Sequence, residues 1–523
     1  MLPTQRTPLF NTNPPANRPL PLPSPRIRWL NRFLGQTPSH CKLGQGAIEA
    51  ESMDARLDSA FETWGKFTKK MDEAPAIPGR LSYDPFRGVA LELVENREGS
   101  DVGEVLAMCP IPVLFGQLVD GTLVTLLDCI ITKTSLGAGA VGLPTALIAN
   151  RALLGANIAD IDDLKLKSYT VEFSSLSNWM CVSPASLNMV KDDAKLVGVD
   201  ICFRRPDPIH VVLPNRSFDL QISHDWKTSH TNASASVRWH AGIAIQAHEE
   251  IAFRDASHVA WQCQNLMGLL IGQKLSLRSV TITPHDNGSA ARTGSPFKLV
   301  YHQRGKHDES DAHPSRMLLP YDSIKENFAG IVDKWFARSE QAVLAANVFF
   351  GSQLLESPAV NVKFLAVVQA AESYHRALGT GVYMDQAEYD EAIEQLHLPE
   401  SIQGDHRHSL RNRLKYLNEY SLRKRLTDLF DRLPENVRLR IADNVPQFVG
   451  KIVDTRNYYT HYDHEAQQRA FEGQDAFVAA ERLRVLVVAY LLHDLGIEDE
   501  KLLSVLERSR EFKDWMCQDL PLG

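Results

Sequence analysis

Six consecutive residues toward the C-terminal end of the chain combine side chains suited to chemistry on a phosphate. They are Arg456, Asn457, Tyr458, Tyr459, Thr460 and His461. Arginine offers a fixed cationic fork for phosphate oxygens, and histidine is the side chain best suited to moving a proton near neutral pH. On a straight helix, residues five apart stand roughly 140° apart around the axis and about 7.5 Å apart along it. Arg456 and His461 therefore converge only where the helix ends or bends, or where the long arginine arm swings round.

An amphipathic run places this motif at the end of a predicted helix, about 440–460. Its apolar residues repeat at i, i+3, i+4, i+7 and i+8, namely Val445, Phe448, Val449, Ile452 and Val453. That spacing predicts one apolar helix face. An arginine and a histidine also occur by chance on solvated helix ends, so the pair alone does not define a site.

The pattern Arg-Asn-x-x-x-His on a helix resembles the signature of HEPN domains, small helical bundles of which many are metal-independent ribonucleases. A second match lies between Phe364 and His375, where Gln-Ala-x-Glu precedes an aromatic residue and a histidine. This stretch resembles the early helix of ApeA-like HEPN domains, and Glu372 is the acid that matches. We expect Glu372 to orient Arg456 by a bidentate pair across the bundle. The alternative is a solvated glutamate on a helix face.

The resemblance implies RNA cleavage without a metal or cofactor. A 2′-hydroxyl would attack the adjacent phosphate and leave a 2′,3′-cyclic phosphate and a 5′-hydroxyl. His461 would act as general base or acid, Arg456 would stabilise charge on the phosphate oxygens, and Asn457 would position one of them. It also implies a homodimer or higher homo-oligomer, in which two motifs face one cleft and Tyr458 and Tyr459 are partly used for the contact.

A basic segment supplies the candidate surface for an RNA backbone. It lies on one predicted helix, about 408–431, and contains Arg411, Arg413, Lys415, Arg423, Lys424 and Arg425, with Tyr416 and Tyr420 interleaved. Cations bind phosphates, and aromatic rings stack on bases. The alternative is a solvated helix face. The whole chain has a formal net charge of -8 and a pI near 6.1, so an RNA contact must be a local patch.

Two histidine clusters resemble metal sites but have simpler interpretations. His461 and His464 stand near Asp463 and Glu465, yet no further cluster supplies the three or four ligands that a metal site needs. His493-Asp494 resembles the dyad of HD phosphohydrolases, but it lies at a predicted helix end, and we interpret it as a helix C-terminal cap region. Motifs of P-loop, dinucleotide-binding, nucleophile-elbow and zincin enzymes do not occur.

Composition and the pattern of apolar residues divide the chain into three parts. The 523 residues are 44% hydrophobic and 23% charged, as in ordinary globular proteins. Residues 1–52 are Pro-rich and predict a disordered tail, with Met53 as a plausible alternative start. We predict an α+β multidomain protein, with a β-rich domain at 53–315 followed by an all-α helical bundle at 316–523.

Alternating residues and turn signals locate the elements of both parts. Asp120-Gly121 predicts a hairpin turn. A turn that enters a strand is expected at 78–84. Strands are expected at 88–94, 113–118, 121–128, 169–173, 209–213, 236–239 and 242–246, and loops at 284–296 and 306–314. Helices are expected at 253–272, 324–336, 360–378, 385–396, 408–431, 440–460, 471–495 and 498–516.

The β-rich part resembles the N-terminal domain of ApeA-like defence proteins. The matching cues are Trp64-Gly65, the turn from Gly79 to Asp84, and the stretch from Gly121 to Cys129. The resemblance implies anti-phage defence by abortive infection, in which this domain senses infection. A phage protein would be the activating ligand, and tRNA is one candidate target.

The remaining features bear on compartment and on rival functions. Seven scattered cysteines without a C-x-x-C pair fit a reducing cytoplasm, and no run of about 18 apolar residues predicts a membrane span. Two alternatives stay open for the helical part. It is either a catalytically inactive HEPN module that binds RNA or a protein, or a structural scaffold for the β-rich domain.

Overall fold

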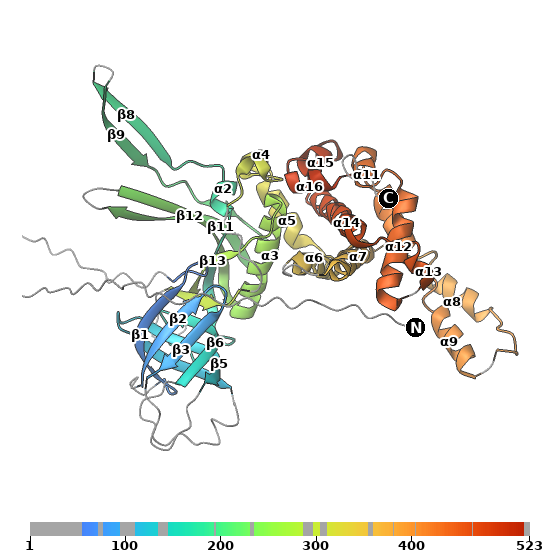
Figure 1. Ribbon diagram of the computed structural model, residues 1–523, viewed down its shortest axis with the longest axis horizontal. Helices are drawn as coiled ribbons and strands as arrows, with labels where there is room; N and C mark the ends of the chain where they lie inside the picture. Colours follow the sequence, from blue (N-terminus) through green and yellow to red (C-terminus); the bar gives the residue numbers. More distant parts are fainter. Residues whose placement is uncertain are drawn as a thin grey trace, which may run out of the picture. The chain divides into compact units, whose positions relative to one another are not determined.

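The computed structural model describes residues 55–516 with several gaps. The gaps are 72–76, 95–109, 134–144, 193–194, 231–234, 286–295, 304–310, 354–358, 380, 403 and 463. The predicted tail at 1–52, Met53 and most of the two predicted loops lie outside the described residues. Within them, strands dominate up to Tyr301 and helices dominate from Tyr321 onward, which confirms the predicted α+β class (Figure 1).

The strands of the N-terminal part pair antiparallel throughout. Their bounds are β1 Phe61–Thr68, β2 Ile77–Asp84, β3 Gly88–Leu93, β4 Ile111–Leu118, β5 Leu123–Lys133, β6 Thr145–Leu154, β7 Lys165–Phe173, β8 Ala185–Asp192, β9 Lys195–Phe203, β10 Ile209–Val211, β11 Phe218–His230, β12 Ala235–Ala252, β13 Leu277–Pro284 and β14 Phe297–Tyr301.

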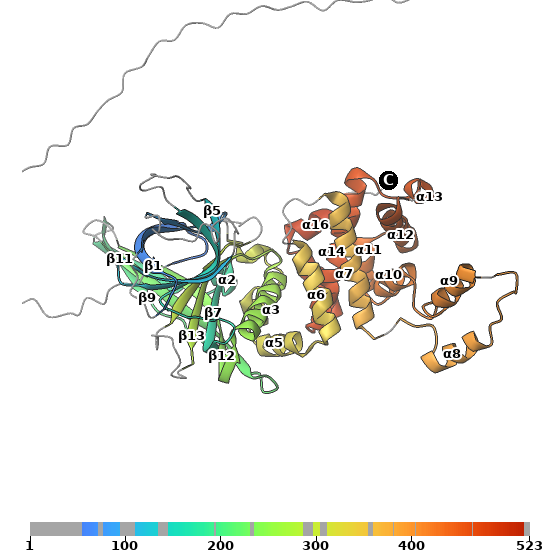
Figure 2. The same ribbon diagram turned by 90° about the horizontal axis from the view of Figure 1, so that it is seen from below.

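Six of these strands close into a barrel. The ring runs β6-β3-β2-β1-β4-β5 and returns to β6 through the β5–β6 pairing (Figure 2). Closure removes the free edges that an open sheet would expose. Inward-facing residues such as Leu81, Leu91 and Leu126 are fully buried, so the barrel interior is packed with side chains.

Strand β6 is shared between the barrel and an open sheet. Its first half, Thr145–Ala149, pairs with β3, whereas its second half, from Arg151 to Leu154, pairs with β14 along the same edge. From β14 the sheet continues through β13, β7, β12, β11 and β10. The amphipathic helix α3, Phe253–Ile271, packs against β7 and β12.

The sequence predicted half of the strands that the structure describes in the β-rich part. Gly121 has a φ of 89° between β4 and β5, a left-handed conformation that glycine adopts without a steric penalty. The two strands expected at 236–239 and 242–246 form one continuous strand, β12. The sequence pattern missed β1, β6, β8, β9, β11, β13 and β14.

The C-terminal part consists of helices around one central helix. Their bounds are α4 Tyr321–Ile324, α5 Phe328–Ala337, α6 Glu340–Gln353, α7 Val360–Ala377, α8 Gln386–Glu394, α9 Gly404–Leu414, α10 Leu422–Asp431, α11 Glu435–Ile441, α12 Val445–His461, α13 His464–Gln467, α14 Gly473–Asp494, α15 Asp499–Leu506 and α16 Arg510–Trp515. Helix α14 is buried on every side, as expected of a helix in the middle of a bundle.

Three predicted helices are interrupted. The helix expected at 324–336 ends at Ile324 and resumes at Phe328, and that expected at 498–516 divides into α15 and α16. The prediction of one basic helix at 408–431 is wrong, because α9 ends at Leu414 and a separate helix, α10, begins at Leu422. The Ser421 side chain caps α10 by accepting a hydrogen bond from Lys424 N.

The segment around the predicted domain boundary at 315 packs against the β-rich part. Trp179, on the short helix α2 (Leu176–Trp179), donates to Leu319 O at 2.7 Å, and its ring contacts Tyr321 and Phe328. Trp335 donates to Gln262 O in α3 at 3.1 Å. The division at 315 stays a prediction, and α4 and α5 contact the N-terminal part across it.

Candidate functional site

Helix α12 brings the Arg-Asn-x-x-x-His motif to its C-terminal end. The helix begins after Asn444, whose side chain accepts a hydrogen bond from Gln447 N. Its apolar face is buried through Phe448, Val449 and Ile452, which confirms the periodicity of the sequence. The following residues therefore keep a fixed helical orientation up to His461.

The end of α12 is a left-handed turn made by a tyrosine. Tyr462 has a φ of 53°, and its N–H donates to Tyr458 O at 2.7 Å. A bulky residue with positive φ is uncommon, and such conformations occur often at functional sites. The helix is unbroken from Arg456 to His461, so the two side chains leave it roughly 140° apart. Within one chain, convergence would depend on the reach of the arginine.

Arg456 and His461 are both available to a ligand. Arg456 is half-buried, and within the described residues its guanidinium makes one hydrogen bond, from Nη1 to Asn457 Oδ1 at 3.3 Å. The other N–H donors of the fork remain for phosphate oxygens. His461 is exposed. Asn457 is thus placed beside the arginine, as a residue that positions a phosphate oxygen would be.

The tyrosines of the motif differ in environment. Tyr459 packs its ring edge-on against Phe364 of α7, with centroids 5.8 Å apart, and so contributes to the bundle itself. Tyr458 contacts Tyr462, which is exposed beside His461. An aromatic surface therefore borders the histidine.

Glu372 does not pair with Arg456 as expected. Its carboxylate accepts from Arg376 Nη2 at 3.1 Å, one turn along the same helix. The i, i+4 spacing on α7 offers this partner at little cost in conformational entropy. The expected bidentate pair between Glu372 and Arg456 is therefore wrong. A catalytic role for Glu372 stays a prediction.

Of the predicted RNA-binding residues, five are exposed and one is not. Arg411 and Arg413 lie on α9, Lys415 follows them, and Arg423 and Lys424 lie on α10. Arg425 is only 2% exposed, and its Nε donates to Tyr420 O at 3.0 Å. The prediction that Arg425 binds RNA is therefore wrong, because its position on α10 directs the side chain into the bundle.

Arg425 instead centres a buried polar cluster that the sequence did not reveal. Its Nη1 donates to His375 Nδ1 at 3.2 Å, and His375 Nε2 lies 2.7 Å from Asp428 Oδ2. A guanidinium only donates, so Nδ1 must accept and the imidazole proton must sit on Nε2. Burial lowers the pKa of His375, and the hydrogen bond to Asp428 only partly offsets this effect.

The same arginine joins the two ends of the segment that carries α8 and α9. Its Nη2 lies 3.5 Å from Gly381 O and 3.3 Å from Glu419 Oε2. Gly381 has a φ of 137°, and a Cβ built there would lie 2.5 Å from Arg425 Nη1. Tyr420 N also donates to Gly381 O at 2.8 Å, so residues 381 and 420 are held together at the start and the end of the segment.

Two family models match the chain in the order of its two parts. The model described as ApeA N-terminal domain 1 matches residues 62–335, and the model described as Apea-like HEPN matches residues 365–501. The first of these alone covers more than half of the chain. The chain belongs to the ApeA family of HEPN proteins. Neither a curated protein nor a solved structure gives a match.

The predicted catalytic residues of this ApeA-type chain all lie in the part that is assigned to the HEPN family. Glu372, Arg456, Asn457 and His461 all lie within the stretch that matches the Apea-like HEPN model. HEPN domains are in general ribonucleases, and the pairing with an ApeA domain points to a nuclease-type defence protein. No helix among the residues that the structure describes is long and apolar enough to cross a bilayer.

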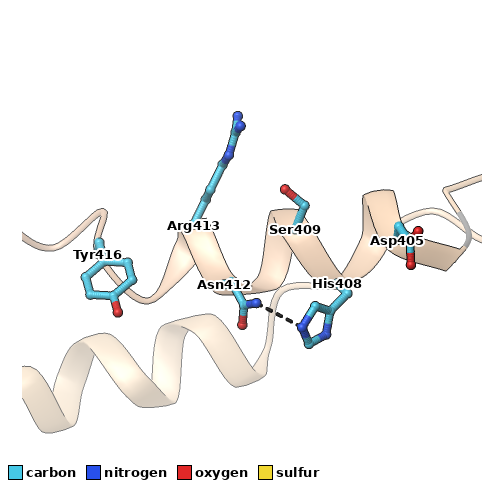
Figure 3. A pocket seen from close by; sticks show the side chains of 6 residues that line it. All are labelled: Asp405, His408, Ser409, Asn412, Arg413 and Tyr416. Carbon is cyan, nitrogen blue, oxygen red and sulfur yellow. Dashed lines mark hydrogen bonds between the residues drawn. The ribbon is translucent and has the colours of Figure 1, made fainter. Parts of the chain in front are cut away.

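An open hollow of about 410 Å³ lies along α9 of the ApeA-type chain (Figure 3). Its lining residues are Asp405, His408, Ser409, Asn412, Arg413 and Tyr416. Asn412 donates to His408 at 3.0 Å, while Arg413 points away from that pair. The lining comes from α9 and the turn after it and includes none of the predicted catalytic residues. We interpret it as part of an exposed surface.

The two histidine clusters do not form metal sites within the described residues. His464 begins α13 and is exposed, and Asp463 lies outside the described residues. His493 is half-exposed near Asp499, whereas Asp494 turns inward and accepts from Tyr374 OH. Burial raises the pKa of the Asp494 carboxyl. The predicted helix end is confirmed, since α14 ends at Asp494 and Gly496 N donates to His493 O at 2.8 Å.

Proposed function

We propose that this chain is a metal-independent endoribonuclease that acts in the cytoplasm in anti-phage defence by abortive infection. The observation that carries the proposal is the placement of Arg456 and His461 at the accessible end of α12, inside the stretch that matches the Apea-like HEPN model. A guanidinium with N–H donors still available and an exposed imidazole are the two groups that transesterification of RNA requires.

The proposed reaction uses the 2′-hydroxyl of RNA as the nucleophile. Its oxygen bonds to the adjacent phosphorus, the bond to the 5′-oxygen breaks, and the products carry a 2′,3′-cyclic phosphate and a 5′-hydroxyl. His461 accepts the proton of the nucleophile or donates one to the leaving oxygen. Arg456 stabilises the charge that develops on the phosphate oxygens, and Asn457 positions one of them.

A homodimer would supply the second proton-transfer group. The helix geometry separates Arg456 from His461 within one chain, and two copies of α12 facing each other would place two of each residue around one phosphate. The exposed ring of Tyr462 and the partly buried ring of Tyr458, which contact each other, are suited to such a contact. A chain that is fully active as a monomer by light scattering would exclude this arrangement.

RNA would be held by the exposed cations of α9 and α10. Arg411, Arg413 and Lys415 are solvent-accessible near the exposed ring of Tyr416, and Arg423 and Lys424 follow on α10. Cations beside an accessible aromatic ring match the pattern by which single-stranded RNA is bound through phosphates and stacked bases.

Cleavage of RNA in excess EDTA tests the catalytic proposal. We expect the purified chain to cut single-stranded RNA, with products that resist 3′-end labelling until the cyclic phosphate is opened and the resulting phosphate is removed. The His461→Ala variant should bind RNA but not cut it. Strict dependence on a divalent metal would refute the proposal, and binding without cleavage by the parental chain would identify an inactive HEPN module.

The N-terminal part is proposed to sense infection through a phage protein. A nuclease that stops growth needs restraint, and the ligand must bind the active arrangement better than the resting one. Challenge of expressing bacteria with a phage panel tests this role, with His461→Ala as the matched control. Protection that persists in His461→Ala would exclude defence by RNA cleavage. tRNA is the first target to be examined.

A further inference from the structure

Strands β8 and β9 form a hairpin that is separate from the large sheet (Figure 1). They pair with each other over Ala185–Phe203, and within the described residues neither strand pairs with another element. A two-stranded hairpin is at best marginally stable in water without a covering element. Its solvent-facing side chains therefore indicate what covers it.

The register assigns the side chains of this hairpin to two different faces. Leu187 lies opposite Ile201, and Met189 lies opposite Val199. Because successive side chains alternate, these four share one face, and the register shift after Val190 adds Leu196 opposite Lys191. We call Leu187, Met189, Leu196, Val199 and Ile201 the apolar hairpin face.

The opposite face of the hairpin has a different character. The pairs Ser186–Cys202 and Asn188–Asp200 alternate with the apolar ones and are exposed, and Val190, near the tip, is the one large apolar residue paired on this face. Polar side chains toward solvent on one face and apolar ones on the other are the pattern of a strand pair that buries one side. Here both sides are exposed, the apolar side included.

The apolar hairpin face exposes a large apolar area. All five side chains are between 48% and 68% exposed. At roughly 100 Å² each, they form a patch of about 500 Å², at the upper end of what monomeric proteins expose. Lys191, at the tip, is the single charged residue at these register positions.

Area and charge favour a second copy of the same chain as the occupant. Two facing patches would bury on the order of 1,000 Å², the lower limit of a specific interface. A two-fold contact places each side chain near its own kind, so a patch with charges at its centre would repel itself. The central pairs here, Leu187–Ile201 and Met189–Val199, carry none.

We propose that the β8–β9 hairpins of two chains pack through their apolar hairpin faces in a two-fold contact. The two sheets would stack about 10 Å apart, as in a β-sandwich, with Met189 and Leu187 of each copy at the centre. The contact is distinct from the helical bundle and does not depend on nuclease activity. Its small area makes it weak alone and suited to strengthening by any second contact between the same chains.

Site-specific cross-linking of the full-length chain tests the contact directly. In a background that keeps only the buried Cys129 and Cys263, with Ser at positions 41, 109, 181, 202 and 517, Met189→Cys places a thiol on the apolar hairpin face. Asn188→Cys places one on the opposite face. With a short bis-maleimide we expect a covalent dimer from Met189→Cys at a yield at least tenfold above that of Asn188→Cys and of the background chain. Equal yields from the two positions would overturn the proposal.

Charge insertion provides the second arm of the experiment. Leu187→Lys with Ile201→Lys should reduce the Met189→Cys cross-link at least tenfold, because two-fold packing would bury four lysines together. Ser186→Lys with Asn188→Lys adds the same charge to the opposite face and should leave the yield unchanged. Cross-linking that survives the first pair refutes the contact. A hairpin that never cross-links refutes it too and leaves the patch to a different protein.

Discussion

An arginine and a histidine occur together in two regions of the helical part, and the two regions differ in almost every respect. At the end of α12, Arg456 makes one hydrogen bond among the described residues and His461 is exposed. At the beginning of α10, Arg425 and its neighbour His375 are buried, and the imidazole is bonded at both nitrogens. The residue types are alike, but only one region has groups available for a ligand.

The difference separates chemistry from architecture. A side chain can bind a phosphate or transfer a proton only if its donors are not already occupied. The donors of Arg425 are instead occupied by partners within the protein. These partners lie at both ends of residues 381–420, so the arginine holds the α8–α9 segment to the bundle. Substitutions in the two regions should therefore differ in their consequences, with loss of cleavage at one and loss of stability at the other.

Removal of the α12 groups should have the largest effect on activity. We expect Arg456→Ala and His461→Ala each to lower the rate of RNA cleavage by about 10²–10⁴-fold, the range for loss of one acid–base or charge-stabilising group. Thermal unfolding should change little, because both side chains are accessible. His464→Ala, three residues from His461 and also exposed, is the matched control. Parental rates in either variant would show that the site is elsewhere.

Removal of Arg425 should affect folding most. Arg425→Ala leaves the buried His375 Nδ1 without its donor and removes the hydrogen bonds to Tyr420 O and Glu419, so we expect the free energy of unfolding to fall by about 3 kcal/mol. Arg423→Ala, exposed on the same helix, should change it by less than about 0.5 kcal/mol. Urea denaturation measures both variants. Equal stability of the two would show that the cluster is not structural.

Substitution at Gly381 tests the same cluster from its other side. Gly381→Ala introduces a Cβ about 2.5 Å from Arg425 Nη1 at a φ of 137°, so the guanidinium must move or the backbone must rearrange. We expect a loss of roughly 2 kcal/mol in urea denaturation. Gly351→Ala, where a Cβ would meet no atom within 4 Å, is the control. A neutral effect of Gly381→Ala would mean that the segment tolerates displacement.

Charge reversal on α9 should weaken RNA binding without affecting the chemical step. Arg411→Glu with Arg413→Glu should raise the Kd for single-stranded RNA roughly tenfold and flatten its dependence on salt, since each lost phosphate contact lowers the slope by about one. Cleavage at saturating RNA should stay near the parental rate. Arg510→Glu with Lys513→Glu makes the same charge change on exposed α16 positions. Equal losses from both pairs would point to net charge instead of a local surface.

The smallest effect should be a pH dependence of stability caused by His375. Burial lowers the pKa of this imidazole below the ordinary value of 6.5, so the unfolded chain binds more protons than the folded one just below that pH. Stability is therefore full above about pH 6.5 and falls as the pH drops toward the lowered pKa. His375→Gln should flatten the slope of unfolding free energy between pH 7.5 and 5.5. His224 and His240, whose pKa values burial also lowers, would leave a residual slope.

Much of the local structure could be predicted from the sequence because it depends on neighbouring residues. The apolar spacing before Arg456 predicted α12, and Asp120-Gly121 predicted the β4–β5 turn. The motif itself was recognisable because Arg456, Asn457 and His461 lie within six residues. These features need no knowledge of distant contacts.

Tertiary structure alone decided which charged groups are available and which faces are covered. Arg423 and Arg425 are two residues apart and chemically identical, yet one is exposed and the other pairs with His375, fifty residues earlier in the chain. The β5–β6 pairing that closes the barrel and the exposure of the apolar hairpin face likewise depend on where separate segments meet. The types and spacing of residues determined the candidate chemistry of this chain, and long-range packing decided where a side chain keeps unpaired donors for it.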